Sequence, residues 1–260
     1  MVLPVNRMVS AFKEGRPSFG IYMRTPSEKM VEMLGFAGLD FVRIDLNAAF
    51  FNTEKLESMI RTAHAVGMTP AVRVERNDPF QIQAALGMGA LHIVVPEVGS
   101  RSEVEAAVKA TKLPPIGDRH AGPSSFVGGY GSVSSQEYRA WAKENVTLSV
   151  QVEKRSGVDA IDEIAKVPGL DMVQSGRGTL SFEYGVADQY HPTVMEAEAR
   201  VMAAGIAAGK MTSVQYYPLK DQRQVEWIRD WVKKGVSCIC LGTDIEIVDV
   251  FRRLLKDLKA

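Results

Sequence analysis

Side chains that can bind or activate an anion follow several of the short apolar runs of this chain. Arg73 ends the run 69–73, and Gln151 and Glu153 end the run 147–153. A glycine turn follows the run 172–175 and consists of Gly176, Arg177, Gly178 and Thr179. An arginine can bind a carboxylate through two parallel N–H donors, and the backbone amides of a glycine turn can hold the same anion. These residues predict a pocket for a small acid such as a 2-oxo acid.

Three further groups could handle protons or balance charge near this pocket. Asp45 ends the run 41–45, and Arg43 lies on the same side of that run two residues earlier. Arg43 could place a fixed cation near the site or simply pair with Asp45. His120 follows a short run near Ile116, and a histidine can move a proton near neutral pH. We therefore include His120 among the candidate catalytic residues.

The elements that must position these residues repeat one pattern, in which an amphipathic helical stretch ends near a glycine and a short β-branched run follows. A glycine there adopts the left-handed conformation without a Cβ penalty. Further runs at 19–22, at 147–153 and near Ile116 give about eight strands that alternate with helices, which predicts a parallel sheet. The junction glycines are Gly38, Gly67, Gly89, Gly169, Gly209 and Gly235.

A single (β/α)8 barrel over residues 1–260 fits this length better than an open doubly wound sheet, because no G-x-G-x-x-G motif follows the first run. Active sites of such barrels lie at the carboxyl ends of the strands. The glycine- and serine-rich stretch 117–135 is predicted to be a working loop over the barrel mouth. The last helix, 244–259, is amphipathic and needs an apolar partner, either the barrel wall or a neighbouring subunit.

Composition narrows the classes of partner. The 31 basic residues balance 31 acidic ones, which argues against a nucleic-acid-binding protein or a polybasic membrane protein. No apolar stretch approaches the roughly 20 residues that span a bilayer. The two cysteines, Cys238 and Cys240, alternate within one run and do not suggest a disulfide framework, so we expect a cytoplasmic protein.

Other polar residues have simpler interpretations. His64 lies within a helix and His92 begins a strand at the opposite end of the barrel, so both are interpreted as packing or surface residues. Glu97 follows the run 91–95, and its side chain could be either functional or simply solvated. The sequence leaves both interpretations open.

Four segments of the chain form a recognisable signature. They are Gly38 to Asp45, Val72-Arg73-Val74 with Asn77-Asp78-Pro79 after it, Pro114 to Arg119, and Val150-Gln151-Val152-Glu153. In these segments the chain resembles the class II, metal-dependent pyruvate aldolases of the HpcH/HpaI type. The resemblance implies a barrel enzyme that binds pyruvate to a divalent metal (Mg²⁺, Mn²⁺ or Co²⁺), forms its enolate, and joins or cleaves an aldehyde at the methyl carbon.

The resemblance also assigns roles to individual residues. Arg73 would steady the carboxylate and the enolate oxygen, Gln151 would contact pyruvate, and Glu153 would be a metal ligand. Asp45 would hold a metal-bound water, and the turn Gly176 to Gly178 would cradle the carboxylate with backbone amides. The implied assembly is a homo-oligomer, a hexamer or trimer, whose C-terminal helix is exchanged between subunits.

Several family positions are replaced here. Asn47 and Ala48 stand where the family has a glutamate and the catalytic histidine, and Gly87 stands where it has the partner aspartate. Thr179 replaces the second metal carboxylate, and a single protein carboxylate holds a hard divalent cation poorly. The base would be a metal-bound hydroxide held by Asp45, or His120. The alternative is a divergent member that binds a 2-oxo acid but is a metal-independent lyase or isomerase, or a non-catalytic binding protein.

Overall fold

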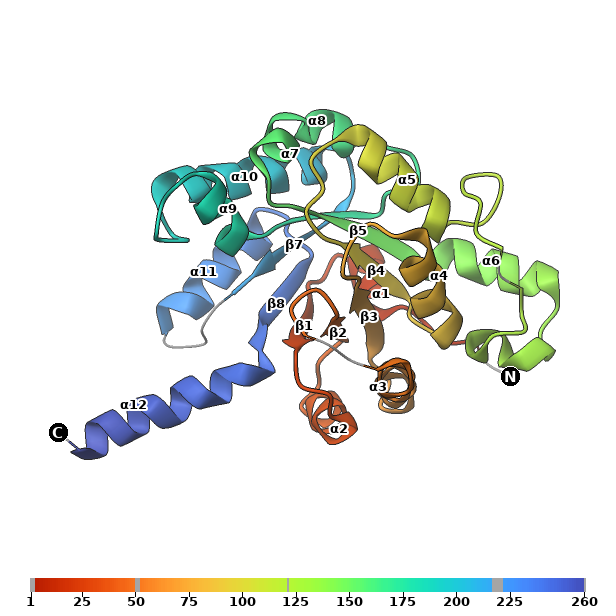
Figure 1. Cartoon of the computed structure of the whole chain (residues 1–260), viewed down its shortest axis with the longest axis horizontal. Helices are drawn as coiled ribbons and strands as arrows, with labels where there is room; N and C mark the ends of the chain where they lie inside the picture. The colour runs from red at the N-terminus through yellow and green to blue at the C-terminus, as the bar shows by residue number, and fades with distance from the viewer. Residues whose placement is uncertain (1–2, 50–51, 121, 217–221, 260) are drawn as a thin grey trace.

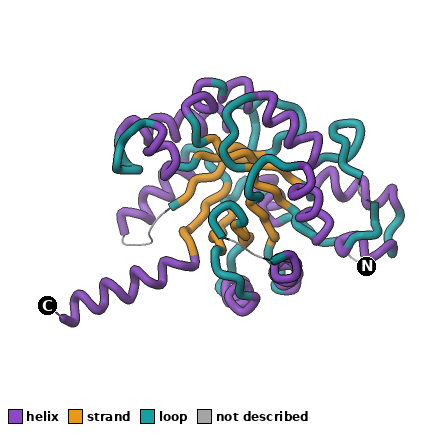
Figure 2. The backbone as a smooth tube through the Cα atoms, viewed as in Figure 1, coloured by secondary structure: helices purple, strands orange, loops and turns teal. Residues whose placement is uncertain are grey.

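Eight parallel strands close into a barrel in the computed structural model, which describes residues 3–49, 52–120, 122–216 and 222–259. Each strand pairs with the next along the chain, and β8 pairs with β1 (Figures 1 and 2). The prediction of a (β/α)8 barrel is confirmed. The strands are β1 (Ser18–Met23), β2 (Phe41–Asp45), β3 (Thr69–Arg73), β4 (His92–Val95), β5 (Thr147–Val152), β6 (Met172–Ser175), β7 (Met211–Gln215) and β8 (Cys238–Thr243).

Helices surround this barrel, and capping side chains explain where several of them begin. Asn52, Asp78 and Ser134 each accept a hydrogen bond from the first turn of the helix that follows, which satisfies otherwise unpaired N–H groups. The helices are α1 (Arg7–Lys13), α2 (Glu28–Phe36), α3 (Thr53–Ala65), α4 (Pro79–Met88), α5 (Arg101–Thr111), η1 (Phe126–Gly131), α6 (Ser135–Asn145), α7 (Arg155–Asp159), α8 (Ile161–Ile164), α9 (Arg177–Glu183), α10 (Pro192–Ala207), α11 (Gln222–Lys233), η2 (Asp244–Glu246) and α12 (Ile247–Lys259).

The glycines between helices and strands have the conformation that the sequence pattern predicts. All six have positive φ, from 68° at Gly209 to 113° at Gly89. A side chain at these positions would be strained, so the glycines fix the points at which the chain leaves a helix and enters the next strand.

One predicted strand is absent. The segment around Ile116 is irregular, and the strand after β4 is β5. Pro114 and Pro115 remove two consecutive backbone donors there, which disfavours pairing in a parallel ladder. The chain passes instead from α5 to the additional helix α6 and only then to β5.

The stretch 117–135 does not cover the barrel mouth. Phe126 packs against the ring of His64 near the end of α3, with ring centroids 5.5 Å apart, and Arg61 of α3 donates a hydrogen bond to Tyr130 Oη at 2.9 Å. His64 also bonds the carbonyl of Gly89, which precedes β4. These contacts lie near the amino ends of β3 and β4, so the predicted loop position was wrong.

Helix α12 extends away from the barrel (Figure 1). None of its residues is buried, and its apolar side chains are open to solvent, with Phe251 56% and Leu258 74% exposed. The wall of its own barrel, one of the two predicted partners, therefore does not cover this helix. Among the described residues no helix is long and apolar enough to cross a membrane.

Candidate active site

A polar cavity of about 330 Å³ opens at the carboxyl ends of the strands, where the barrel rule predicts the site. It brings together Arg73, Gln151, Glu153 and the whole turn Gly176 to Thr179, which are far apart in the sequence. Asp45 lies directly beneath it, bonded to Arg73. The remaining lining residues are Arg24, Asn47, Ala48, Gln189 and Gln215.

Asp45 and Arg73 form a buried two-bond pair between adjacent strands. Arg73 Nε lies 2.7 Å from Oδ1 of Asp45, and Nη2 lies 2.8 Å from Oδ2. Because β2 and β3 pair with Asp45 opposite Arg73, the backbone register brings the two side chains together. Burial alone lowers the pKa of Arg73, but the hydrogen bond and charge of Asp45 help to raise it, so Arg73 stays a cation.

Asp45 accepts additional donors from the protein. Arg24 Nε lies 3.3 Å from Oδ2, and the backbone N–H groups of Asn47 and Ala48 lie 3.2 and 3.3 Å from Oδ1. With the two bonds from Arg73, the carboxylate is surrounded by five N–H donors. Asp45 therefore orients arginines, whereas the resemblance assigns it a metal-bound water.

Glu153 is the carboxylate that faces the cavity. Oε1 accepts a hydrogen bond from the backbone N–H of Glu97 at 3.1 Å, and Oε2 accepts one from Gln151 Nε2 at 3.1 Å. Burial raises the pKa of Glu153, while the Arg73 charge, the Glu97 N–H and a hydrogen bond from the Thr179 side chain oppose the rise. The net direction is upward, which suits a group that exchanges a proton.

Glu97 contributes its backbone to the site rather than its side chain. Its φ is 56°, and its carboxylate is 53% exposed beside Lys154. A left-handed conformation is costly for a residue with a Cβ and is often found at functional sites. Of the two interpretations left open by the sequence, the solvated side chain agrees with the structure, and the contact with Glu153 comes from the backbone N–H.

The glycine turn packs against Gln151 of β5 and against Glu153, which directly follows that strand. A Cβ at Gly176 would overlap both side chains, so another residue there would displace them from their present positions. Helix α9 begins at Arg177, and the first N–H groups of a helix have no partner within it. The turn, with its backbone amides, therefore forms part of the cavity wall.

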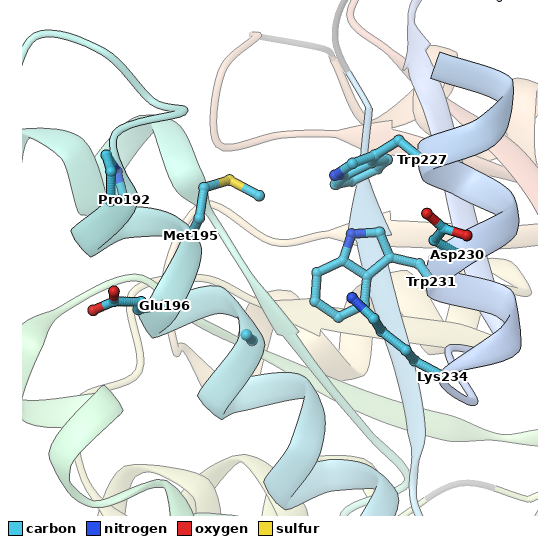
Figure 3. Close-up of a pocket in the computed structure, with 8 residues that line it drawn as sticks. Pro192, Met195, Glu196, Trp227, Asp230, Trp231 and Lys234 are labelled. Atoms are coloured by element: carbon cyan, nitrogen blue, oxygen red, sulfur yellow. The ribbon is translucent and has the colours of Figure 1, made fainter. Parts of the chain in front are cut away.

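The side chain of Arg177 has a structural role. It lies 3.6 Å from Glu198 and stacks between the rings of Tyr190 and Trp227, 4.8 and 4.9 Å from their centroids. Trp227 belongs to a second cavity of about 430 Å³ between α10 and α11, where Met195 faces the two tryptophans of α11 (Figure 3). None of the residues predicted for the active site lines that outer cavity.

His120 does not reach the active site within the chain. It is exposed, and the backbone N–H of neighbouring Arg119 bonds the carbonyl of Lys112, whose Nζ bonds the carbonyl of Val146 just before β5. These contacts lie at the amino end of the barrel, because the run near Ile116 is not a strand. The prediction that His120 follows a strand at the mouth was wrong.

Arg43 does not form the pair with Asp45 that is one of its two predicted roles. It is fully buried in the barrel interior and donates a hydrogen bond to Tyr22 Oη at 2.6 Å. Among the described residues it has no ion pair with Asp45; that place is taken by Arg24 and Arg73.

His92 is a buried packing residue, as predicted. Its two ring nitrogens form hydrogen bonds with Thr147 and Ser149.

Sequence reasoning missed Arg24 and Gln215. Each stands at the end of a strand, Arg24 directly after β1 and Gln215 as the last residue of β7. Both positions follow the rule that predicts Arg73, namely that polar residues at the carboxyl ends of barrel strands form the site. The sequence predicts a first strand that ends at Tyr22, so Arg24 lies outside the predicted set.

The residues present do not fit the divalent metal that the resemblance implies. Asp45 is enclosed by N–H donors, Thr179 donates to Glu153 where a second carboxylate would stand, and only Glu153 is left as a carboxylate ligand. Mg²⁺ and similar ions require several oxygen ligands around them. In the part of the chain that the structure describes, no group of three or more His, Cys, Asp or Glu side chains could hold a metal ion.

The chain is similar to known proteins over most of its length. The HpcH/HpaI aldolase/citrate lyase family matches residues 18–246. The 5-keto-4-deoxy-D-glucarate aldolase of Shigella boydii serotype 18 is 28% identical, over 94% of this chain and 93% of its own. The structure of the citrate synthase SbnG is 30% identical, with a TM-score of 0.84 and coverage of 96% of this chain and 95% of that one.

A more distant structure, the CitE protein of Mycobacterium tuberculosis, holds magnesium and acetate. At 14% identity and a TM-score of 0.60, over 86% of this chain and 85% of that one, it shows a shared fold only. The barrel, the position of the cavity and the match over residues 18–246 lead to one conclusion. The chain belongs to the HpcH/HpaI aldolase/citrate lyase family and is a carbon–carbon lyase of the aldolase type.

Proposed function

We propose that this lyase cleaves or forms 4-hydroxy-2-oxo acids, with pyruvate or a close relative as the 2-oxo acid and a short aldehyde as the second substrate. The observation that supports this most directly is the position of Arg73. Three of its five donors bind Asp45 and Gln151, which leaves one N–H on Nη1 and one on Nη2 for a ligand in the cavity. The amides of the turn Gly176 to Thr179 form another wall of the same cavity.

The proposed cleavage uses groups that line the cavity. A base takes the proton of the 4-hydroxyl group, the bond between C3 and C4 breaks, and the aldehyde leaves. The electron pair of that bond forms the C2–C3 double bond, so negative charge moves to the C2 oxygen, where Arg73 stabilises it. A proton then adds to C3 and gives the 2-oxo acid.

Glu153 is the proposed proton carrier. It is the one carboxylate among the described residues lining the cavity, and burial raises its pKa. The two bases expected from the sequence, a metal-bound hydroxide held by Asp45 and the side chain of His120, fit less well. Asp45 is enclosed by N–H donors, and His120 lies at the amino end of the barrel. Binding roles for Gln151 and the turn amides complete the proposal.

The test is turnover by the purified full chain. Pyruvate or oxaloacetate is incubated with a panel of short aldehydes, both with a chelator and with Mg²⁺, Mn²⁺ or Co²⁺. Aldol product or decarboxylation in any of these conditions, lost in Arg73→Gln, supports the proposal. No turnover under any condition, together with intact folding, would favour the alternative of a non-catalytic binding protein.

We also propose that the protein is a homo-oligomer, a hexamer or trimer, in which α12 packs on a neighbouring subunit. The exposed apolar residues of α12 and the partly exposed Ile21 and Leu241 of β1 and β8 support this arrangement.

We propose a cytoplasmic location because the two cysteines, Cys238 and Cys240, are buried free thiols. Cell fractionation tests this location.

A further inference from the structure

The cavity contains a second arginine that neither the family resemblance nor the sequence pattern identifies. We infer that Arg24 and Arg73 together supply the positive charge that stabilises the keto oxygen of the substrate, in place of a divalent metal ion. This inference rests on the proposed function, because it concerns how the same cavity binds a 2-oxo acid. It identifies Arg24 as a substrate-binding residue.

The two guanidinium groups share one carboxylate. Asp45 is bonded by Arg73 through Nε and Nη2 and by Arg24 through Nε, at 2.7, 2.8 and 3.3 Å. One negative charge thus neutralises one of two positive charges, and the net charge of the three groups is +1. Because Asp45 is completely buried and Arg24 lines the cavity, this excess charge faces the space where substrate binds.

Arg24 keeps most of its donors free. Its Nε bonds Asp45, and in the described ranges neither of its Nη atoms has a hydrogen-bond partner. Its side chain is 31% exposed, so the guanidinium reaches solvent at the cavity and can meet an incoming anion. The side chain of Arg73, by contrast, is 9% exposed and is held by three hydrogen bonds.

The backbone at Arg24 is fixed by the neighbouring strand end. The N–H groups of Arg24 and Thr25 donate to the two carboxylate oxygens of Asp244, at 2.9 and 2.8 Å. Asp244 directly follows β8, and β8 pairs with β1. The barrel closure therefore positions Arg24 at the mouth, so that little additional ordering is needed when a ligand binds.

The donor set of the cavity favours guanidinium groups over a metal ion. Asp45 already accepts five N–H groups, and Glu153 accepts bonds from Glu97, Gln151 and Thr179. A divalent ion would have to displace these donors and would lie beside two cations that repel it. The carboxylate and keto oxygens of a 2-oxo acid instead match the paired N–H groups of an arginine.

The experiment measures binding of oxamate, an isostere of pyruvate that chelates metals weakly, to the full chain by titration calorimetry. The protein is first treated with a chelator, and the titration is repeated with added Mg²⁺ and Mn²⁺. We expect binding without metal and a change in Kd of less than about threefold when metal is added. Arg24→Gln should weaken binding about tenfold or more, and Arg24→Lys should weaken it less.

Arg16→Gln is the matched control. Arg16 is a half-exposed arginine that also bonds an aspartate, Asp40, but before β1 at the other end of the barrel, so its loss should leave oxamate binding unchanged. Thr179→Asp is the converse variant, since it adds a carboxylate beside Glu153. It should bind Mn²⁺ measurably by electron paramagnetic resonance where the native chain does not.

The outcomes separate this inference from the proposed function. Oxamate binding that requires metal, or that is the same in Arg24→Gln, overturns the inference, and so does no oxamate binding in any condition. Turnover that is abolished by the chelator and restored by metal also overturns it while the proposed function stands. Metal-free oxamate binding that depends on Arg24, without turnover of any substrate, supports the inference and contradicts the proposed function.

Discussion

The backbone N–H of Glu97 donates to Oε1 of Glu153 at 3.1 Å, and Glu97 adopts a left-handed φ of 56° in the turn that makes this contact. The contact joins the loop after β4 to the end of β5. A residue with a Cβ in this conformation costs about 1–2 kcal/mol, so the turn is held by its surroundings.

Substitutions at Glu97 should separate its backbone from its side chain. Glu97→Gly and Glu97→Gln should keep kcat/KM within about threefold, because each retains the N–H and glycine accepts the positive φ. Glu97→Val should lower the free energy of unfolding by about 1–2 kcal/mol and reduce kcat/KM, since a β-branched residue resists this conformation. Urea unfolding and steady-state kinetics measure both effects. A large loss of activity in Glu97→Gln would show that the carboxylate acts directly.

Gly176 and Gly178 form a matched pair for testing the turn. Gly176→Ala places a methyl group against Glu153 and Gln151, whereas the Cβ of Gly178→Ala meets nothing within 4 Å. We expect a loss of about 100-fold or more in kcat/KM for the first variant, since an ångström of misplacement can cost that much, and little change for the second. Equal effects would contradict the close approach at Gly176.

Removing the charge of Asp45 should destabilise the protein strongly. Asp45→Asn leaves Arg73 buried without its counter-charge, and breaking a buried pair in this way costs about 3–5 kcal/mol. The free energy of unfolding from urea titration measures this loss. Asp78→Asn at the exposed start of α4 is a suitable control, because asparagine caps a helix about as well as aspartate. A loss below about 1 kcal/mol in Asp45→Asn would contradict the proposed burial of the pair.

The raised pKa of Glu153 gives stability a defined pH dependence. Burial favours the protonated form in the folded state, so between the unfolded and the folded pKa the folded chain binds more protons than the unfolded one. The contribution of Glu153 to stability is therefore present below the unfolded pKa and is lost as the pH rises through the folded value. Glu153→Gln should lose less stability than the native chain across this interval.

The same shift should appear in the kinetics if ionised Glu153 is the base. The acidic limb of kcat/KM against pH should then lie above about 4.3, the ordinary glutamate value. Glu153→Gln should abolish this limb along with most of the turnover. An unchanged pH profile in Glu153→Gln would assign the proton transfer to another group.

Helix α12 offers a test of the proposed assembly. Leu254→Glu places a charge among its exposed apolar residues and should shift the mass measured by light scattering towards the monomer. Lys256→Glu changes a charged residue on the same helix and should leave the mass unchanged. A native chain that is monomeric at micromolar concentration would contradict the proposed oligomer.

The barrel could be predicted from the sequence because its signals are local. Each junction glycine, such as Gly67, marks the end of a helix because it adopts a positive φ that other residues avoid. In any parallel barrel the carboxyl ends of the strands lie at the same end, so residues that end a strand, such as Arg73, are predicted to lie there. The exact partners could not be predicted in the same way. The pairing of Asp45 with Arg73 and Arg24 depends on register and on side-chain conformations that no local pattern specifies.

The two errors near Ile116 have a single origin. The sequence pattern predicts a strand from a short apolar run although Pro114 and Pro115 precede it, and this prediction places His120 and the stretch 117–135 at the wrong end of the barrel. The signal against a strand is the pair of consecutive prolines, because it removes two neighbouring donors from any ladder.

Tyr22 lies below the cavity, where its Oη accepts hydrogen bonds from Arg43 at 2.6 Å and from Gln215 at 2.7 Å, and its ring lies 5.2 Å from the Arg73 guanidinium. The barrel centre and the cavity floor thus form one continuous stack of charged and aromatic groups. A substitution such as Arg43→Met would look like a repacking of the interior, yet it would remove a hydrogen-bond donor from Tyr22, the residue that also bonds Gln215 at the cavity wall. In this barrel the packing of the interior therefore supports side chains that line the cavity.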